Sequence, residues 1–206
     1  MINKIKTTGG IIMLSNNQKM SVLAFIGKAK ANTYASTTIM PIKRGNTTQY
    51  QYKNPKFNNF LYTDCYIGVE NFCGSEVVTL DGVPVFCDSY AGIEFIPFDK
   101  VPEAGLVLKE ALSKGPVEDP FYIRGCNGII RGHIQYSVKY IHTGDYISGT
   151  EFIYNANDFQ TYCDKYVKNS YEKDPVDIIN ELLITGTVPD WLIFRCDFQG
   201  GFVSGV

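Results

Sequence analysis

Apolar and polar residues alternate along several short stretches of the chain, a pattern typical of β-strands with one buried face. The stretch "FLYTDCYIG", residues 60–68, alternates in this way, and "EVVTL" and "VPVFCDSYAG" follow it on either side of Asp81-Gly82. Because Asp-Gly is a favoured two-residue turn, these two stretches are predicted to form a β-hairpin. Further strands are predicted at residues 49–52, 132–142, 150–156 and 191–203.

A spacing of three to four residues between apolar positions marks the predicted helices. The first is predicted from Ser21 as N-cap, with Val22, Phe25, Ile26 and Ala29 on one face. Three further helices are predicted at residues 103–114, 157–171 and 176–186.

One short pattern occurs twice: "NFCGSEVV" at residues 71–78 and "YISGTEFI" at residues 146–153. The matching positions are Gly74 and Gly149, Glu76 and Glu151, and Tyr90-x-Gly92 and Phe198-x-Gly200. The first and last glycines lie 18 residues apart in the first copy and 51 in the second. We therefore predict two related halves, the second enlarged by an insertion of about 33 residues.

The predicted architecture is α+β, with helices packed on antiparallel strands in two halves related by a pseudo-twofold axis. Residues 1–20 are expected to be a flexible lead-in to a single domain, residues 21–206. The halves are residues 21–100 and 101–206, and a helical insertion is predicted at 155–188.

Charge and hydropathy narrow the class of partner. A net charge of −2 and a pI near 5.7, with no basic tract, argue against binding to duplex nucleic acid. No apolar run approaches the roughly 18 residues of a membrane span, and the first residues lack the apolar core of a signal peptide. We expect a cytoplasmic protein without a membrane partner, and leave homo-oligomer formation open.

The composition also limits the chemistry. The six cysteines are widely spread with no C-x-x-C pair, so we expect free thiols and no metal site. His133 and His142 are the only histidines, and neither belongs to a nucleophile motif. No phosphate-binding loop or other cofactor motif is present, so no catalytic residue or cofactor is predicted. The stretch Gly125–Gly132, with Arg124 and Arg131 at its two ends, is interpreted as either a plain turn or an anion-binding loop.

Glu76 and Glu151 are the strongest candidates for chemistry. A pseudo-twofold axis would bring their strands together, so the two carboxylates would face one cleft. Such a pair could perform acid/base catalysis, or accept hydrogen bonds from a ligand that stacks on tyrosines. Each glutamate could equally be structural, paired with a nearby arginine.

Part of the chain, mainly residues 21–92, resembles a known family. The residues that carry the resemblance are Tyr34, Arg44, Tyr62, Asp64, Tyr66, Gly68, Phe72, Gly74, Glu76, Val78, Gly82, Pro84, Tyr90 and Gly92. They resemble an uncharacterised bacterial domain often found C-terminal to Xre/Cro-type helix-turn-helix regulators. The family usually has Trp where this chain has Phe86, and the predicted insertion has no counterpart. The resemblance implies a fold unit and ligand sensing, but no reaction.

Together these observations favour a non-enzymatic protein that senses or sequesters a planar polar, nucleotide-like small molecule. A hydrolase or lyase that uses the carboxylate pair is one alternative. A protein–protein inhibitor that acts through the helical insertion is another. The predicted ligand-binding residues are Arg44, Tyr62, Asp64, Tyr66, Glu76, Tyr90, Arg124 and Glu151.

Overall fold

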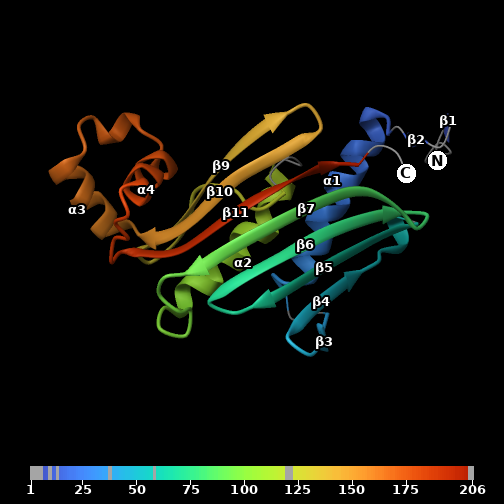
Figure 1. Ribbon diagram of the computed structural model, residues 1–206, viewed down its shortest axis with the longest axis horizontal. Coiled ribbons are helices and arrows are strands. Elements are labelled where there is room, and N and C mark those ends of the chain that lie inside the picture. The colour runs from blue at the N-terminus through green and yellow to red at the C-terminus, as the bar shows by residue number, and fades with distance from the viewer. Residues whose placement is uncertain are drawn as a thin grey trace.

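One antiparallel sheet of nine strands forms the body of the molecule (Figure 1). The computed structural model describes residues 7–8, 11–12, 14–36, 39–57, 59–118 and 123–203. The strand order across the sheet is β3-β4-β5-β6-β7-β11-β10-β9-β8. The strands are β3 (Ile42–Arg44), β4 (Thr47–Tyr52), β5 (Phe60–Gly68), β6 (Asn71–Leu80), β7 (Val83–Glu94), β8 (Ile129–Arg131), β9 (Ile134–Thr143), β10 (Tyr146–Asn155) and β11 (Leu192–Phe202). Two short strands, β1 (Thr7–Thr8) and β2 (Ile11–Ile12), pair only with each other.

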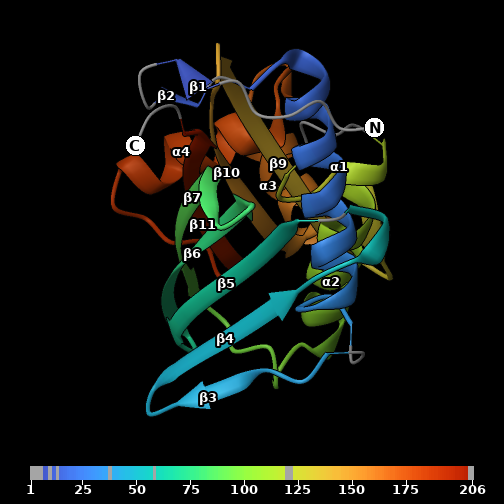
Figure 2. The same ribbon diagram turned by 90° about the vertical axis from the view of Figure 1, so that its right-hand side faces the viewer.

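The helices occupy two places. Helices α1 (Asn16–Asn32) and α2 (Pro102–Glu118) lie side by side on one face of the sheet (Figures 1 and 2). Helices α3 (Ala156–Tyr166) and α4 (Pro175–Ile184) form a lobe at one end of the sheet. Single turns of 3-10 helix occur at η1 (Pro55–Phe57) and η2 (Ser170–Glu172). The predicted α+β class is confirmed, and α3, η2 and α4 fall within the predicted insertion.

Local sequence explains most of these boundaries. The β6–β7 hairpin turns at Asp81 and Gly82, both with positive φ, as a two-residue turn of type I′ requires. The prediction that Ser21 caps the first helix is wrong. The helix begins at Asn16, because Ser15 and Gln18 form a capping box in which each side chain bonds the backbone N–H of the other.

The register places the repeated residues at matching positions in the two halves. Gly74 of β6 pairs with Tyr90 of β7, and Gly149 of β10 pairs with Phe198 of β11. Tyr90 and Phe198 are themselves partners where β7 and β11 meet at the centre of the sheet. We call residues at matching positions register counterparts. The superposition of the two halves as a duplicated unit stays a prediction.

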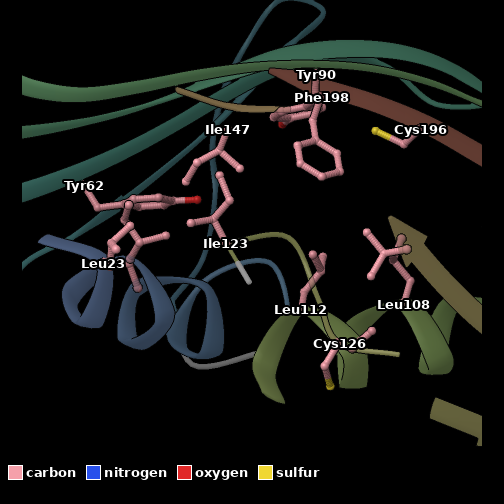
Figure 3. Packing of buried hydrophobic residues seen from close by; sticks show 14 of the residues in the cluster. Leu23, Tyr62, Tyr90, Leu108, Leu112, Ile123, Cys126, Ile147, Cys196 and Phe198 are labelled. Carbon is pink, nitrogen blue, oxygen red and sulfur yellow. The ribbon is translucent and has the colours of Figure 1, made fainter. Parts of the chain in front are cut away.

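The main core lies between the sheet and helices α1 and α2 (Figure 3). Leu23 of α1 packs on the sheet beside Tyr62, while Leu108 and Leu112 of α2 cover the strands near Phe198. A second cluster fills the lobe, where Trp191 contacts the ring of Phe159. The two cores are separate clusters, so the lobe has its own packing.

All six cysteines are free, as predicted. Cys126, Cys163 and Cys196 are buried, whereas Cys73 and Cys87 are exposed on the open face of the sheet. Within the described residues, none of the helices has the length and apolar character needed to cross a membrane.

Candidate functional site

Three carboxylates form a row across the helix-covered face of the sheet. Asp64 of β5 pairs in register with Glu76 of β6, which in turn pairs with Asp88 of β7. Side chains directly opposite each other on neighbouring strands lie on the same face, so the three acids are adjacent. Each is at least 96% buried. A row of buried acids is costly to fold unless cations or hydrogen-bond donors face it.

Two buried cations face this row. Lys30 of α1 donates to Glu76 Oε1 at 2.7 Å. Arg124 donates from Nη1 to the same oxygen at 3.1 Å and from Nη2 to Glu151 Oε1 at 2.9 Å. The guanidinium therefore bridges the two repeated glutamates, and it also lies over the ring of Tyr90, 4.6 Å from the ring centroid.

The segment that carries Arg124 is fixed to strand β9. The Tyr140 hydroxyl accepts from the backbone N–H groups of Arg124 and Gly125 and donates to the Gly125 carbonyl. The Asn127 side chain bonds both the N–H and the carbonyl of Val138. These bonds hold the backbone around Arg124, so the guanidinium keeps its place between the glutamates.

Glu151 is fully paired within the chain. Its Oε1 accepts from Arg124, and its Oε2 accepts from the Tyr136 hydroxyl at 2.5 Å. Glu151 and Tyr136 are both wholly buried. Burial, followed by the charge of Glu151, raises the pKa of Tyr136 well above its ordinary value. This glutamate has the geometry of a structural anchor.

Glu76 and Asp88 differ from Glu151 because polar atoms on them lack partners. Among the described residues, the buried side-chain atoms without a hydrogen bond are Glu76 Oε2, both carboxylate oxygens of Asp88, and Arg124 Nε. Unpaired buried polar atoms are rare in folded proteins and call for an explanation. Here they gather in one cluster, three acceptors against one donor.

A cavity of about 210 Å³ adjoins this cluster. It lies between the sheet and the two covering helices, since Asp64 and Glu76 line it from the strands and Lys30 and Leu108 from the helices. Aromatic side chains supply much of the remaining wall, namely Tyr34, Tyr62, Tyr66, Phe72, Tyr90, Phe98 and Phe194. Exposed Lys43 and Val69 also line the cavity, which places its mouth beside the β5–β6 turn.

Two of the acids titrate near neutral pH. Burial, followed by the charge of Glu76, raises the pKa of Asp64 to about 7, although the Tyr90 hydroxyl donates to Asp64 Oδ1 at 2.7 Å. The same two causes raise the pKa of Asp88 to about 7. Burial, followed by the charge of Asp64, raises the pKa of Tyr90, so this hydroxyl stays protonated and donates. Of the two, Asp64 lines the cavity, and a perturbed carboxyl beside a cavity marks a candidate functional site.

The structure brings most of the predicted site residues together. Those that line the cavity are Tyr62, Asp64, Tyr66, Glu76, Tyr90 and Arg124. Glu151 touches the cluster through Arg124 without lining the cavity. Arg44 is absent from the lining: it is exposed on the short edge strand β3. Its neighbour Lys43 lines the cavity instead, because successive side chains of a strand point to opposite faces.

Sequence reasoning missed Lys30, Asp88 and Tyr136. Lys30 follows Ile26 by four residues and therefore continues the apolar face of α1. Asp88 lies between Phe86 and Tyr90 in the alternation of β7, so its burial was readable from the same pattern. Helical and strand periodicity could have found both residues.

The glycine-rich stretch after α2 forms a turn and the short strand β8, which was not predicted. Both of its arginines pair with acids of the chain itself: Arg124 with the two glutamates, and Arg131 with Glu110. Both arginines are thus already paired with acids, and the choice between a plain turn and an anion-binding loop stays a prediction. In the described part of the chain, no group of three or more His, Cys, Asp or Glu side chains has metal-binding geometry.

The fold and site define an α+β protein with a buried, acid-rich cavity between a sheet and two helices. The chain belongs to the DUF5680 family, a domain of unknown function, which it matches over residues 64–174. The expectation of an uncharacterised domain family is confirmed in that form, and an association with Xre/Cro-type regulators stays a prediction. No curated protein and no solved structure matches the chain.

Proposed function

We propose that the protein binds a small polar molecule in the cavity beside Glu76, and that it acts by sensing or sequestering this ligand. One observation carries the proposal: Glu76 Oε2 and Arg124 Nε are buried beside a cavity and have no hydrogen-bond partner among the described residues. Pockets with a few convergent polar groups and apolar walls are the usual small-molecule sites. Aromatic walls suit a planar ligand, as the sequence led us to expect.

The size of the cavity limits the ligand. Drug-sized ligands occupy pockets of roughly 300–1,000 Å³. At about 210 Å³ the cavity suits a molecule of one ring with polar substituents. For a nucleotide-derived ligand, the base would enter and the phosphates would remain at the mouth near Lys43.

Native mass spectrometry of the protein purified from its own host tests this proposal. We expect a bound small molecule that is recovered chemically unchanged after denaturation. Glu76→Gln is expected to lose this ligand, whereas Glu110→Gln, a change in a surface carboxylate paired with Lys114, should retain it. Equal retention by wild type and Glu76→Gln would reject the cavity as the site.

A hydrolase or lyase is the second candidate, and Asp64 is the observation that favours it. A carboxyl with a pKa of about 7 that lines a cavity is suited to general acid/base catalysis. Glu76 and Glu151, the pair proposed from the sequence, are bridged by Arg124 and support this role less. Incubation with a metabolite pool distinguishes the two functions, because an enzyme yields product and a binding protein returns its ligand unchanged.

A protein–protein inhibitor that acts through the lobe is a third candidate. Exposed apolar side chains on and beside α3 and α4 favour it, among them Tyr171 and Ile184, which are 84% and 86% exposed. Changing both to Ser should abolish partner inhibition under this function. Under the ligand-binding proposal, the same change should leave ligand retention intact.

A further inference from the structure

We propose that the ligand of this cavity is an organic cation, a protonated amine or an amidinium group carried on a small flat molecule. This inference rests on the proposed function and names the chemical class of its ligand. It follows from the charges and free hydrogen-bonding atoms of the buried cluster.

The cluster has more negative than positive groups. The buried acids are Asp64, Glu76, Asp88 and Glu151, and the buried bases in the described residues are Lys30 and Arg124. Four carboxylates against two cations leave a formal charge of −2 when all are ionised. A buried excess of charge is unfavourable, so the cluster must bind protons or a cation.

The hydrogen-bonding atoms show the same imbalance. Among the buried side-chain atoms of the described residues, the unpaired acceptors are Glu76 Oε2 and both oxygens of Asp88, and the unpaired donor is Arg124 Nε. Asp64 and Glu76 line the cavity with acceptor oxygens, whereas Asp88 lies next to Glu76 outside the lining, so a ligand beside these acids must mainly donate. Ammonium and amidinium groups donate two or more hydrogen bonds and carry the missing charge.

An anionic group fits the buried end of the cavity poorly. Lys30 and Arg124 are the cations available to it, and both already pair with Glu76, while Arg124 also pairs with Glu151. A phosphate or carboxylate placed there would add to the excess negative charge. A divalent metal ion is disfavoured by geometry, since the described acids do not converge as metal ligands.

The aromatic walls also favour a cation. Tyr62, Tyr66 and Phe72 line the cavity, and ring faces attract cations that lie within about 6 Å of their centroids. Donors at the inner end and an aromatic body against these rings describe an aryl amidine or an arylalkyl amine, both of which are cations at neutral pH.

Proton release should accompany binding. The charged and titratable groups that face the acids are Lys30 of α1, Tyr50 of β4, Tyr62, Asp64 and Tyr66 of β5, Glu76 of β6, Asp88 and Tyr90 of β7, Tyr136 of β9, Glu151 of β10, Cys196 of β11, and Arg124 after α2. Of these, Asp64 and Asp88 have pKa values of about 7, so they hold protons at lower pH. A cation competes with these protons, and its affinity should increase as the pH rises through 7.

Isothermal titration calorimetry with benzamidine, benzamide and benzoate tests the proposal. These probes share one ring and differ in charge: positive, neutral and negative. We expect benzamidine to bind at least ~30-fold more tightly than benzamide, with no measurable binding of benzoate. Its affinity should increase from pH 6 to pH 8 by up to about tenfold per pH unit for each proton released. Titrations in two buffers of different ionisation enthalpy measure that release.

Two variants locate the binding. Asp64→Asn should lower the affinity for benzamidine by at least ~10-fold, and the melting temperature of this variant should show that it still folds. Glu110→Gln should bind like wild type. Benzamide or benzoate binding as tightly as benzamidine would overturn the cation assignment and leave small-molecule binding intact. Failure of all three probes would also overturn the cation assignment, while ligand recovery by native mass spectrometry judges the proposed function separately.

Discussion

The two halves of the sheet carry the same glutamate at the same register position, yet they treat it differently. In the second half, Glu151 uses both oxygens, one for Arg124 and one for Tyr136. In the first half, Glu76 uses one oxygen for two cations and leaves the other unpaired. The same position thus serves as an anchor in one half and leaves a free acceptor beside a cavity in the other.

The neighbours of the two glutamates explain the difference. Glu76 lies between Asp64 and Asp88, and at the matching positions Glu151 lies between Val138 and Cys196. The second half therefore folds with a single acid where the first half has three. Of the two additional acids, Asp64 lines the cavity, which supports a role for it in binding.

The largest effect is expected from removing the residue that joins the halves. Arg124→Met leaves Glu151 without a cation in the described structure, so we expect a loss of about 3–5 kcal/mol in the free energy of unfolding. For a chain of this length, the melting temperature should fall by roughly 10 °C or more. Thermal and urea unfolding measure both quantities.

Arg131→Met is the matched control for Arg124→Met. Its side chain is 47% exposed and pairs with Glu110 at the surface, so the loss should be at most ~1 kcal/mol. Equal stability of the two variants would show that Arg124 does not hold the halves together.

The next largest effect is expected from replacing each of the two glutamates, Glu76 and Glu151, by glutamine. Glu151→Gln should cost about 2–4 kcal/mol, because an amide has one acceptor oxygen in place of the two that accept from Arg124 and Tyr136. Glu76→Gln should cost less than ~1 kcal/mol, since Asp64 and Asp88 remain near Lys30 and Arg124. The effects on ligand binding should have the reverse order: Glu76→Gln should lower the affinity for the ligand by roughly 30- to several-thousand-fold, and Glu151→Gln should lower it less.

Calorimetry and melting curves on both variants check this reversal. A Glu76→Gln protein with unchanged affinity and a much lower melting temperature would make Glu76 structural, like its register counterpart. The functional contrast between the halves would then be wrong.

The third effect depends on pH. Burial raises the pKa of Asp88 in the folded protein to about 7, above the ordinary value of 3.8. For such a group, the favourable contribution is complete below about pH 4 and is lost as the pH rises through 7. Asp88→Asn should therefore stabilise the free protein by about 1–3 kcal/mol at pH 8, and by less at pH 5, where the folded protein keeps Asp88 protonated.

Urea unfolding at pH 5 and pH 8 checks this prediction. Asp190→Asn, a change at an exposed aspartate, should behave like wild type at both pH values. A stabilisation by Asp88→Asn of equal size at pH 5 and pH 8 would contradict the charge explanation.

The elements of the fold could be predicted where pattern and turn chemistry agree. The alternation of β5 and the Asp81-Gly82 turn correctly predicted the positions of strands β5, β6 and β7. The start of α1 was set too late because Ser15 and Gln18, outside the apolar pattern, form the cap. Strand β8 was missed because it has only three residues, which is too short to show an alternation of apolar and polar positions.

The site was predictable only in part, because sequence shows which face a residue takes but not which charges meet there. Tyr62, Asp64 and Tyr66 share one face of β5 by alternation, and all three line the cavity. Lys30 reaches Glu76 across 46 positions of chain, and no local pattern indicates such a pair. That both oxygens of Asp88 are unpaired could be seen only in the structure, because it depends on which residues surround Asp88 in space.

The smallest effect should come from loosening the lobe from the second half. Lys139 of β9 donates to both oxygens of Asp177 on α4 at 2.6 Å. Both side chains are more than 40% exposed, so water screens the pair, and Lys139→Gln should cost at most ~1 kcal/mol in the free energy of unfolding.

Because the lobe has its own core and contributes no residue to the cavity lining, the affinity of Lys139→Gln for benzamidine should stay within twofold of wild type. Urea unfolding and calorimetric titration with benzamidine check the two expectations, with Lys173→Gln, a change at another surface pair, as the control. A clear change in affinity for Lys139→Gln alone would show that the lobe communicates with the first half through β9, and would favour a role for the lobe in presenting the bound state to a partner.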